Sequence, residues 1–280
     1  MRKVFRPQSL EQLWQIQQEQ ADAVPLAGGT DLLVKIRAGI VDPPALIALE
    51  SIAELAVIEE FPDEIALGAG VTHSRLLNSP LIQTHFQVLI KSLQVLGSPH
   101  IRNMGTIGGN IMTASPAADT LPPLYTLQAD IELIKQESRR RLPLTDFIID
   151  PGRTRIENGE ILSRIIIPKK PVFSCHFFEK VGLRQALSIA IISLAALYNL
   201  APDNTITDLR LAWGSLGPTI VTRPEIENFM VGNILNKTLL EEAGDRLRQQ
   251  ISPISDIRAG ADYRRQIAGS LLQRLELNGR

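Results

Sequence analysis

The run Gly105-Thr106-Ile107-Gly108-Gly109-Asn110, followed directly by Ile111 to Asp119, is the most informative part of this sequence. It has an upstream counterpart in Ala27-Gly28-Gly29-Thr30-Asp31-Leu32-Leu33. Each segment places a glycine pair beside a small polar residue, so successive backbone N–H groups can converge on an anion without obstruction by Cβ atoms. Either segment alone is more often a tight turn between a strand and a helix. Together they predict a clamp for a pyrophosphate.

An acidic residue follows each glycine pair, Asp31 in the first segment and Asp119 after the second. These carboxylates are useful near a phosphate only if they face sugar hydroxyls or an N–H donor of a flavin or nucleobase. The common nucleotide motifs are absent: Gly68 to His73 has a histidine where G-x-G-x-x-G needs its third glycine, and no P-loop motif occurs. A bound dinucleotide therefore requires another architecture.

The composition is that of an ordinary globular protein. A chain of 280 residues with 44% hydrophobic and 21% charged residues can bury a large core and form two or three lobes. The net charge of −1 and the 5% aromatic content argue against nucleic acid as a partner. The apolar run 189–200 is shorter than the ~20 residues of a membrane span, and Met1 to Pro7 leads into no secretory signal. A cytoplasmic location is expected.

Cys175 is the only cysteine of the chain. One thiol excludes an internal disulfide and an iron–sulfur cluster held by four thiolates of this chain. The histidines at 73, 85, 100 and 176 have no metal-ligand spacing, so no metal site is expected. The apolar surroundings of Cys175 favour a buried structural thiol over a nucleophile, and no catalytic triad can be defined.

Apolar spacing and turn residues predict a small β-α-β lobe at the N-terminus, within residues 1–55. Its elements are a helix over 9–20 capped by Ser9, a strand over 23–27, a helix over 32–37 capped by Thr30 or Asp31, and a buried strand over 45–49.

The middle of the chain, 56–170, is expected to form a second lobe. Its predicted elements are a strand over 65–70, a helix starting at Thr72, a helix over 80–96, an apolar segment over 122–127, and a hairpin of 129–135 with 139–144. The basic triplet Arg139 to Arg141 is expected to be a solvated turn.

Pro168-Lys169-Lys170-Pro171 predicts a boundary, with a third domain over 171–280. The apolar runs 189–200 and 206–213 flank a turn at 202–205 and suggest an antiparallel pair, although 189–200 could instead be a buried helix. Helices are predicted over 224–230, 239–250 and 261–276.

Five stretches of this sequence resemble the flavin-binding medium subunit of the molybdenum hydroxylases, the group of xanthine dehydrogenase, carbon monoxide dehydrogenase and nicotinate dehydrogenase. The resemblance spans nearly the whole chain. It is carried by Ala27 to Leu33, Gly68 to Thr72, Ile101 to Asn110 with Ala114 to Asp119, Glu160 to Pro168, and Phe178 to Ala190.

The resemblance implies an α+β fold of the vanillyl-alcohol-oxidase type, in which two subdomains bind FAD and a C-terminal domain combines an antiparallel sheet with helices. It assigns the FAD pyrophosphate to both glycine segments, and valine at Gly28 or Gly108 should then abolish FAD binding without unfolding the chain. It implies that FAD is held by Ala27, Gly28, Gly29, Thr30, Asp31, Leu32, Leu96, Gly97, Thr106, Ile107, Gly108, Gly109, Asn110, Asp119, Leu162 and Lys180.

Three nearby residues stay open at this level. His100 stands where many relatives have glutamine. Arg102 could offset phosphate charge or pair with a surface acid, and the same two possibilities hold for Arg153.

The resemblance further implies two partners, a 2Fe-2S iron–sulfur subunit and a molybdenum-cofactor subunit, with NAD as a candidate electron acceptor. No general acid or base is expected in this chain, because the cofactor carries the chemistry. Two alternatives remain: a self-contained flavin oxidoreductase of the same fold, and a flavin-free structural or assembly subunit that keeps the glycine segments only as turns.

Overall fold

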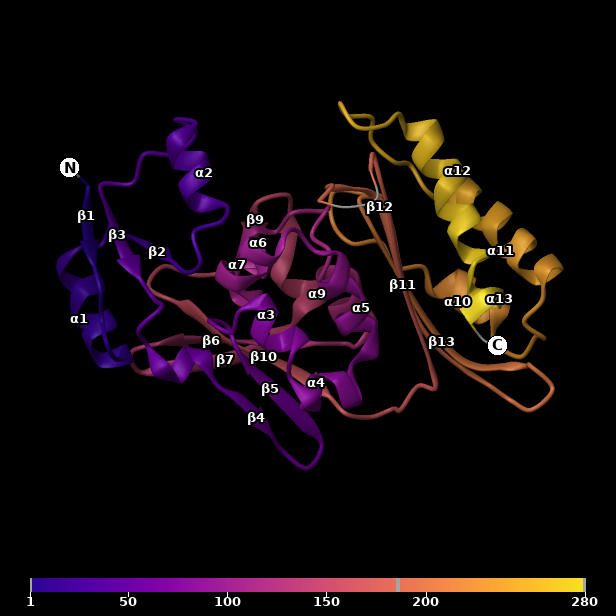
Figure 1. Cartoon of the computed structure of the whole chain (residues 1–280), viewed down its shortest axis with the longest axis horizontal. Helices are drawn as coiled ribbons and strands as arrows, with labels where there is room; N and C mark the ends of the chain where they lie inside the picture. The colour runs from indigo at the N-terminus through magenta and orange to yellow at the C-terminus, as the bar shows by residue number, and fades with distance from the viewer. Residues whose placement is uncertain (1, 185–186, 279–280) are drawn as a thin grey trace.

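The computed structural model describes residues 2–184 and 187–278, so Gln185 and Ala186 of the Phe178 to Ala190 stretch lie outside the described residues. Three sheets of three or five strands follow one another along the described part of the molecule, each with helices against it (Figure 1). The first is a parallel sheet in the order β1-β3-β2. Its lobe comprises β1 (Lys3–Phe5), α1 (Leu10–Glu19), β2 (Val24–Leu26), α2 (Leu32–Arg37) and β3 (Ala45–Ala48), and the 3-10 helix η1 (Ala53–Ala56) leads onward.

Helix α1 begins as predicted, because the Ser9 side chain accepts a hydrogen bond from the Gln12 N–H. Asp31 precedes α2 but makes no capping hydrogen bond with its side chain. None of the residues of α2 is fully buried, and Leu33 and Val34 are exposed. This helix is therefore held mainly through its connections to β2 and the first glycine segment.

The second sheet is antiparallel, in the order β4-β5-β10-β6-β7. Its strands are β4 (Ile58–Glu60), β5 (Glu64–Gly68), β6 (Asp130–Lys135), β7 (Ser138–Pro143) and β10 (Ile161–Pro168). The helices packed with it are α3 (His73–Leu77), α4 (Pro80–His85), α5 (Gln87–Val95), α6 (Pro99–Met104), α7 (Ile107–Thr113), α8 (Leu121–Thr126) and α9 (Leu144–Phe147), followed by the short pair β8 (Ile148–Asp150) and β9 (Arg153–Thr154).

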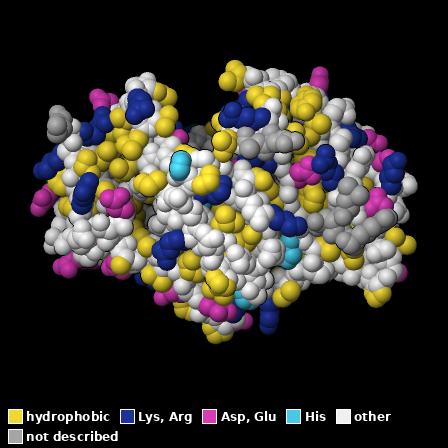
Figure 2. Space-filling view, in the orientation of Figure 1, with side chains coloured by type: hydrophobic (Ala, Val, Ile, Leu, Met, Phe, Trp, Pro, Cys, Tyr) yellow, Lys and Arg dark blue, Asp and Glu magenta, His cyan; other side chains and the backbone are white. Residues whose placement is uncertain are grey.

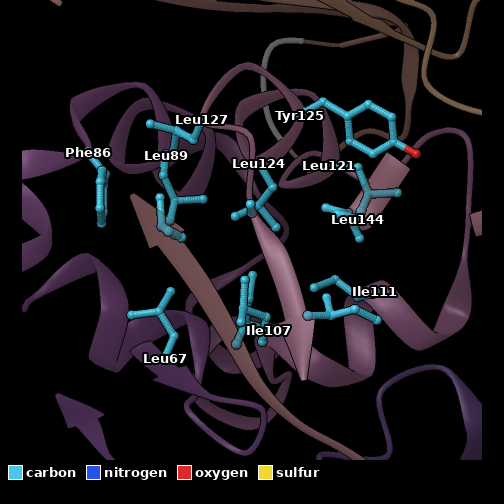
Figure 3. Close-up of a cluster of buried hydrophobic side chains, with 14 of the residues drawn as sticks. Leu67, Phe86, Leu89, Ile107, Ile111, Leu121, Leu124, Tyr125, Leu127 and Leu144 are labelled. Carbon is cyan, nitrogen blue, oxygen red and sulfur yellow. The ribbon is translucent and has the colours of Figure 1, made fainter. Parts of the chain in front are cut away.

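The largest core lies between this sheet and its helices. Figure 3 shows Leu67 of β5 and Ile107 and Ile111 of α7 facing Leu89 of α5 and Leu124 of α8. Burial of such side chains contributes about 1.5–3 kcal/mol each relative to exposure. This core fixes the position of α7, which carries the second glycine pair.

Two predictions for the second lobe need correction. The helix expected over 80–96 is divided into α4 and α5 at Phe86, whose φ of −130° and ψ of 55° are not helical. The basic triplet is not a turn: it lies in β7, where Arg140 pairs with Glu160 at 2.6 Å and Arg141 with Asp130 at 2.8 Å. These carboxylates come from other strands or loops, which keeps the arginines in the sheet.

The third sheet is antiparallel, in the order β11-β12-β13. Its strands are β11 (Cys175–Gly182), β12 (Ala190–Leu200) and β13 (Ile206–Gly214), and its helices are α10 (Pro224–Met230), α11 (Lys237–Gln250), α12 (Ala261–Leu272) and α13 (Leu275–Asn278). The strand interpretation of 189–200 is confirmed and the helix interpretation is wrong. The helix predicted over 261–276 ends at Leu272, and α13 follows separately.

Strand β12 looks continuously apolar because both of its faces are buried. Ala195 and Leu197 join the core of the second lobe, whereas Leu194 and Ala196 join the core formed with α11 and α12. The third sheet is therefore packed directly against the second lobe. Within the described residues, no helix is long and apolar enough to cross a bilayer.

Candidate cofactor-binding site

The first glycine segment connects β2 to α2 and is half-buried from Ala27 to Leu32. Gly29 has a φ of +70°, which favours glycine at this turn. Among the described residues, no acceptor is recorded for the backbone N–H groups from Gly28 to Leu32. A row of unbonded N–H groups before a helix is suited to bind an anion.

The second glycine segment is the first turn of α7 rather than a loop. The Thr106 side chain accepts a hydrogen bond from the Gly109 N–H at 3.0 Å and so caps this helix. The N–H groups of Ile107, Gly108 and Asn110 donate to Val71 O, Ala69 O and Thr106 O. The two segments therefore differ: the first offers free donors, and the second offers a closely packed wall.

The fold brings the two segments together. A Cβ built on Gly28 would lie 1.7 Å from Met104 O, so the backbone of the first segment packs directly on the residues before α7. The Thr113 hydroxyl, at the end of α7, donates to Asp31 Oδ2 at 3.2 Å. Asp31 also pairs with Lys35 at 2.7 Å, so its carboxylate already has a cationic partner.

This packing shows that Gly28 and Gly108 are needed for the close approach of neighbouring backbone. A Cβ on Gly108 would lie 2.5 Å from Ala69 Cβ and 2.7 Å from Ala69 O. Because backbone cannot move aside cheaply, valine at Gly28 or Gly108 disrupts the packing of the lobes. This packing argues against the expectation that these variants stay folded.

Asp119 is buried in the segment just before α8. Its Oδ2 accepts a hydrogen bond from Lys180 Nζ at 2.7 Å, while Oδ1 has no partner among the described residues. Burial raises the pKa of Asp119 to about 6, and the charge and hydrogen bond of Lys180 act in the opposite direction. A buried oxygen without a donor is costly unless a ligand supplies the donor.

Lys180 and Arg102 together hold the turn at the end of α5. Lys180 Nζ also donates to Val95 O at 2.7 Å, and Arg102 Nη1 donates to Leu96 O at 2.9 Å and Gly97 O at 3.1 Å. Cations at the C-terminal end of a helix stabilise its free carbonyl groups. Arg102 thus fixes Leu96 and Gly97, and no ion pair between it and an acid is recorded among the described residues.

Asn110 and Leu162, two further predicted site residues, are connected to these segments. The Thr120 hydroxyl donates to Asn110 Oδ1 at 2.5 Å, which ties α7 to the Asp119 segment. Leu162 is buried in β10, where the neighbouring Ser163 carbonyl accepts from Ala69 N–H at 2.8 Å. Ala69 O in turn accepts from Gly108, so β10 is linked to α7 through Ala69, and Leu162 shares a core with Ile107 and Ile111 of α7.

His73 is a site neighbour that sequence reasoning used only to reject a nucleotide motif and a metal site. It is buried, its backbone N–H donates to Gly105 O at 3.0 Å, and its Nδ1 has no partner within the described chain. Burial, with a smaller contribution from Arg102, lowers the pKa of His73 to about 4. A neutral imidazole therefore lies against the Met104–Gly105 backbone. The sequence signal that could have placed His73 is Thr72, the N-cap residue of the helix that begins at His73.

His100, Arg153 and Cys175 lie outside this group of contacts. His100 is exposed on α6, and Arg153 is exposed on β9. Cys175 is a free thiol at the start of β11 and is half-exposed rather than buried. Among the described residues, no cluster of three metal-ligating side chains occurs.

The surface above α6 and α7 is concave. Figure 1 shows α2 and the β11–β12 hairpin rising on either side of these helices. Figure 2 shows a hollow at the upper edge of the molecule, between the N-terminal lobe and the C-terminal domain. A separate open hollow of about 570 Å³, lined by residues such as Asn233 and Glu242, lies in the C-terminal domain and contains none of the predicted site residues. The free donors of the first glycine segment and the unpartnered carboxylate oxygen of Asp119 belong to two segments that are both hydrogen-bonded to α7, through Thr113 and through Asn110.

A family model described as the FAD binding domain in molybdopterin dehydrogenase matches residues 1–170. The chain belongs to this family. A second model, the CO dehydrogenase flavoprotein C-terminal domain, matches residues 177–278. The chain is therefore an FAD-binding subunit of an oxidoreductase, as the resemblance predicted.

Two named relatives align with this chain over most of their own length. The nicotinate dehydrogenase FAD-subunit of Eubacterium barkeri is 29% identical over 276 residues, covering 97% of this chain and 93% of the relative. The carbon monoxide dehydrogenase medium chain of Hydrogenophaga pseudoflava is 28% identical over 254 residues, covering 91% and 88%.

Solved structures show the same fold. A chain of quinoline 2-oxidoreductase from Pseudomonas putida 86 superposes with a TM-score of 0.93 at 27% identity, covering 99% of this chain and 96% of that one. A chain of the Cu,Mo-CO dehydrogenase gives a TM-score of 0.92 at 27% identity, with the same coverage. The predicted FAD-binding fold with a C-terminal domain of sheet and helices is confirmed.

Proposed function

We propose that this chain is the electron-transferring FAD subunit of a molybdenum hydroxylase complex. In this proposal it receives electrons from a 2Fe-2S subunit, which is reduced by a molybdenum-cofactor subunit, and passes them to an external acceptor such as NAD. The single cysteine supports the need for a partner, because this chain cannot supply four thiolates to a cluster.

The observation that carries the proposal is that two sets of unsatisfied groups lie on segments that both contact α7. The N–H row from Gly28 to Leu32 lacks acceptors and suits a pyrophosphate, and Asp119 Oδ1 lacks a donor and suits an N–H or hydroxyl of the cofactor. A dinucleotide carries both complementary kinds of group. These residues therefore fit FAD.

The same residues define what the protein contributes. The first segment would hold the pyrophosphate, with Thr106, Ile107, Gly108, Gly109 and Asn110 forming the wall beside it. Asp119, Lys180, Leu96, Gly97 and Leu162 would surround the flavin end, where Lys180 and Arg102 keep the Leu96–Gly97 turn rigid. When bound, FAD supplies one-electron and hydride chemistry, so no side chain is assigned as general acid or base.

We divide the chain into an FAD-binding subdomain over 1–55, a second FAD-binding subdomain over 56–170 and a C-terminal domain over 171–280. The division follows the three sheets, each of which is completed within one of these ranges.

Exposed apolar side chains border the proposed cofactor site and fit a docking surface for the partner. Met104 and Ile101 of α6 are 53% and 41% exposed, and Val95 at the end of α5 is 41% exposed. Apolar surface of this kind marks interaction sites, and electron transfer requires a close approach of the partner.

Purification of the chain with its co-purifying partners tests the proposal. We expect a yellow protein that releases FAD on heating, associates with a cysteine-rich iron–sulfur protein, and alone oxidises no purine, aldehyde or N-heterocycle. Slow NADH-dependent dye reduction by the chain alone would support NAD as acceptor. A colourless chain would support the structural alternative, and robust substrate turnover without partners would support the self-contained flavoenzyme.

A further inference from the structure

Ser215, the residue after β13, joins the C-terminal domain to the Asp119 segment. It is buried and has a φ of +60°, which is uncommon for a residue other than glycine. Its backbone N–H donates to Pro116 O at 2.8 Å, and its hydroxyl donates to Ala190 O at 3.1 Å. Strained backbone persists only where its surroundings hold it in place.

Arg264 of α12 holds Ser215 from the other side. Its guanidinium Nη1 donates to Ser215 O at 2.7 Å and to Ile191 O at 2.8 Å, and Nη2 donates to Asp256 Oδ1 at 2.7 Å. The residue is 1% exposed, and burying a charged guanidinium is expensive. These bonds hold the end of the third sheet, and this end contacts the FAD-binding domain through the hydrogen bond from Ser215 to Pro116.

The Pro116 segment is held on several sides. It begins at Ala114, which is buried with a φ of +45°, and ends at Asp119, which pairs with Lys180. Gly214 is packed against this region, because a Cβ there would lie 3.5 Å from Pro116 O and 3.1 Å from Cγ of Pro122 in α8. Small movements of Ser215 would therefore be transmitted to the segment that carries Asp119.

We infer that Arg264 and Ser215 are positioning residues of the FAD site: α12, through Arg264, Ser215 and Pro116 in series, sets where the unpartnered oxygen of Asp119 is presented. The inference rests on the proposed placement of Asp119 beside FAD. It gives the C-terminal domain a second route to the cofactor besides Lys180.

The test measures the Kd of the full chain for FAD, by titrating the FAD-free protein and following flavin fluorescence. Arg264→Met is expected to raise the Kd about tenfold, as for loss of a charged hydrogen bond, and Arg264→Lys is expected to recover part of this. Arg248→Met is the matched control, because Arg248 lies in the same domain, pairs with Asp245 and has no recorded bond to Ser215. A fall in thermal stability without a change in Kd for Arg264→Met would overturn the inference.

A double-mutant cycle with Asp119→Asn separates positioning from general damage. If Arg264 acts through the Asp119 segment, the two changes in Kd are non-additive, whereas Arg248→Met and Asp119→Asn combine additively. Additive effects of Arg264→Met and Asp119→Asn would refute the series of contacts. An unchanged Kd for Asp119→Asn alone would instead refute the proposed position of Asp119, so the two failures are distinguishable.

Asp256→Asn covers the case in which Arg264→Met does not fold. This change keeps Arg264 in place and removes only the charge of its partner, which is 27% exposed. We expect the Kd for FAD to rise about threefold and the effect again to be non-additive with Asp119→Asn. An unchanged Kd in folded protein would contradict the inference.

Discussion

Lys180 of β11 donates a hydrogen bond of 2.7 Å to Asp119, a residue of the FAD-binding domain that lies 61 positions earlier in the chain. The two side chains are 7% and 10% exposed, so the pair is buried between the C-terminal sheet and the Asp119 segment. Lys180 donates to Val95 O as well. One ammonium group thus links two parts of the proposed flavin end to the third sheet.

Removing Lys180 should damage stability and FAD binding by separable routes. Lys180→Met leaves Asp119 buried without its partner, and we expect the free energy of unfolding to fall by about 3 kcal/mol. The double variant Lys180→Met with Asp119→Leu removes both charges and should recover most of this stability. Its affinity for FAD should stay weak, because the carboxylate is absent. Denaturant unfolding and FAD titration of both variants check this, and recovery of FAD affinity would contradict it.

Asp119 should make the FAD-free protein more stable at mildly acidic pH. Burial raises the pKa of Asp119 from 3.8 to about 6, so the folded protein holds this proton more tightly than the unfolded chain does. Its contribution to the free energy of unfolding is therefore largest below the unfolded pKa and is lost as the pH rises through about 6. We expect the stability difference between the wild type and Asp119→Asn to decrease from about pH 4 to about pH 7. A flat or rising difference would mean that Lys180 outweighs burial.

His73 should show the opposite slope. Burial lowers the pKa of His73 from 6.5 to about 4, so the unfolded chain binds the proton more tightly. Its contribution is fully present above the unfolded pKa and is lost as the pH falls toward about 4. Denaturant unfolding of the wild type and His73→Gln should therefore show a difference that decreases on acidification. A difference that is constant between about pH 7 and pH 4 would place His73 in contact with water.

The sequence predicted those helices and strands whose caps and turns are formed by residues close together in the chain. Ser9 caps α1, Thr72 caps α3, and the turn at 202–205 separates β12 from β13. The glycine segments could be recognised as a pair, yet the second became a helix because the Thr106 side chain caps it and the core holds Ile107 and Ile111. The capping threonine was present in the sequence, but two glycines in succession disfavour a helix.

The features that the sequence did not predict depend on contacts between residues far apart in the chain. The arginines of β7 suggested a solvated turn, because the carboxylates that pair with them, such as Glu64 on β5 and Glu160 before β10, become neighbours only in the sheet. The resemblance named Lys180, Asp119 and Leu96, but their connection depends on packing of the third sheet against α5 and α8. The role of Arg102 at the Leu96–Gly97 turn likewise requires the fold.

The glycines of the site should separate into two classes. Gly28→Ala should lower the free energy of unfolding by about 3 kcal/mol or more, because the new Cβ would meet Met104 O. A Cβ on Gly109 would lie 3.0 Å from Thr106 Oγ1 and 3.9 Å from Ala27 Cβ, which needs only a small adjustment. Gly109→Ala should therefore fold and bind FAD about tenfold more weakly, since the methyl group fills space beside the first segment. Thermal unfolding and FAD titration distinguish the two, and equal stability of both variants would contradict the packing argument.

The exposed apolar residues of α6 should serve partner binding rather than the fold. Met104→Glu places a charge on a side chain that is 53% exposed, so we expect FAD content and thermal stability to stay close to those of the wild type. Association with the iron–sulfur partner should weaken by about tenfold or more, because a buried unpaired charge at an interface is costly. Phe61→Glu is the matched control: Phe61 is 40% exposed in the β4–β5 turn, at the opposite edge of the molecule from α6 (Figure 1). Co-purification and binding measurements on the two variants check the prediction. Equal loss of association in both would show that charge alone is responsible, and no loss in Met104→Glu would place the partner on another face.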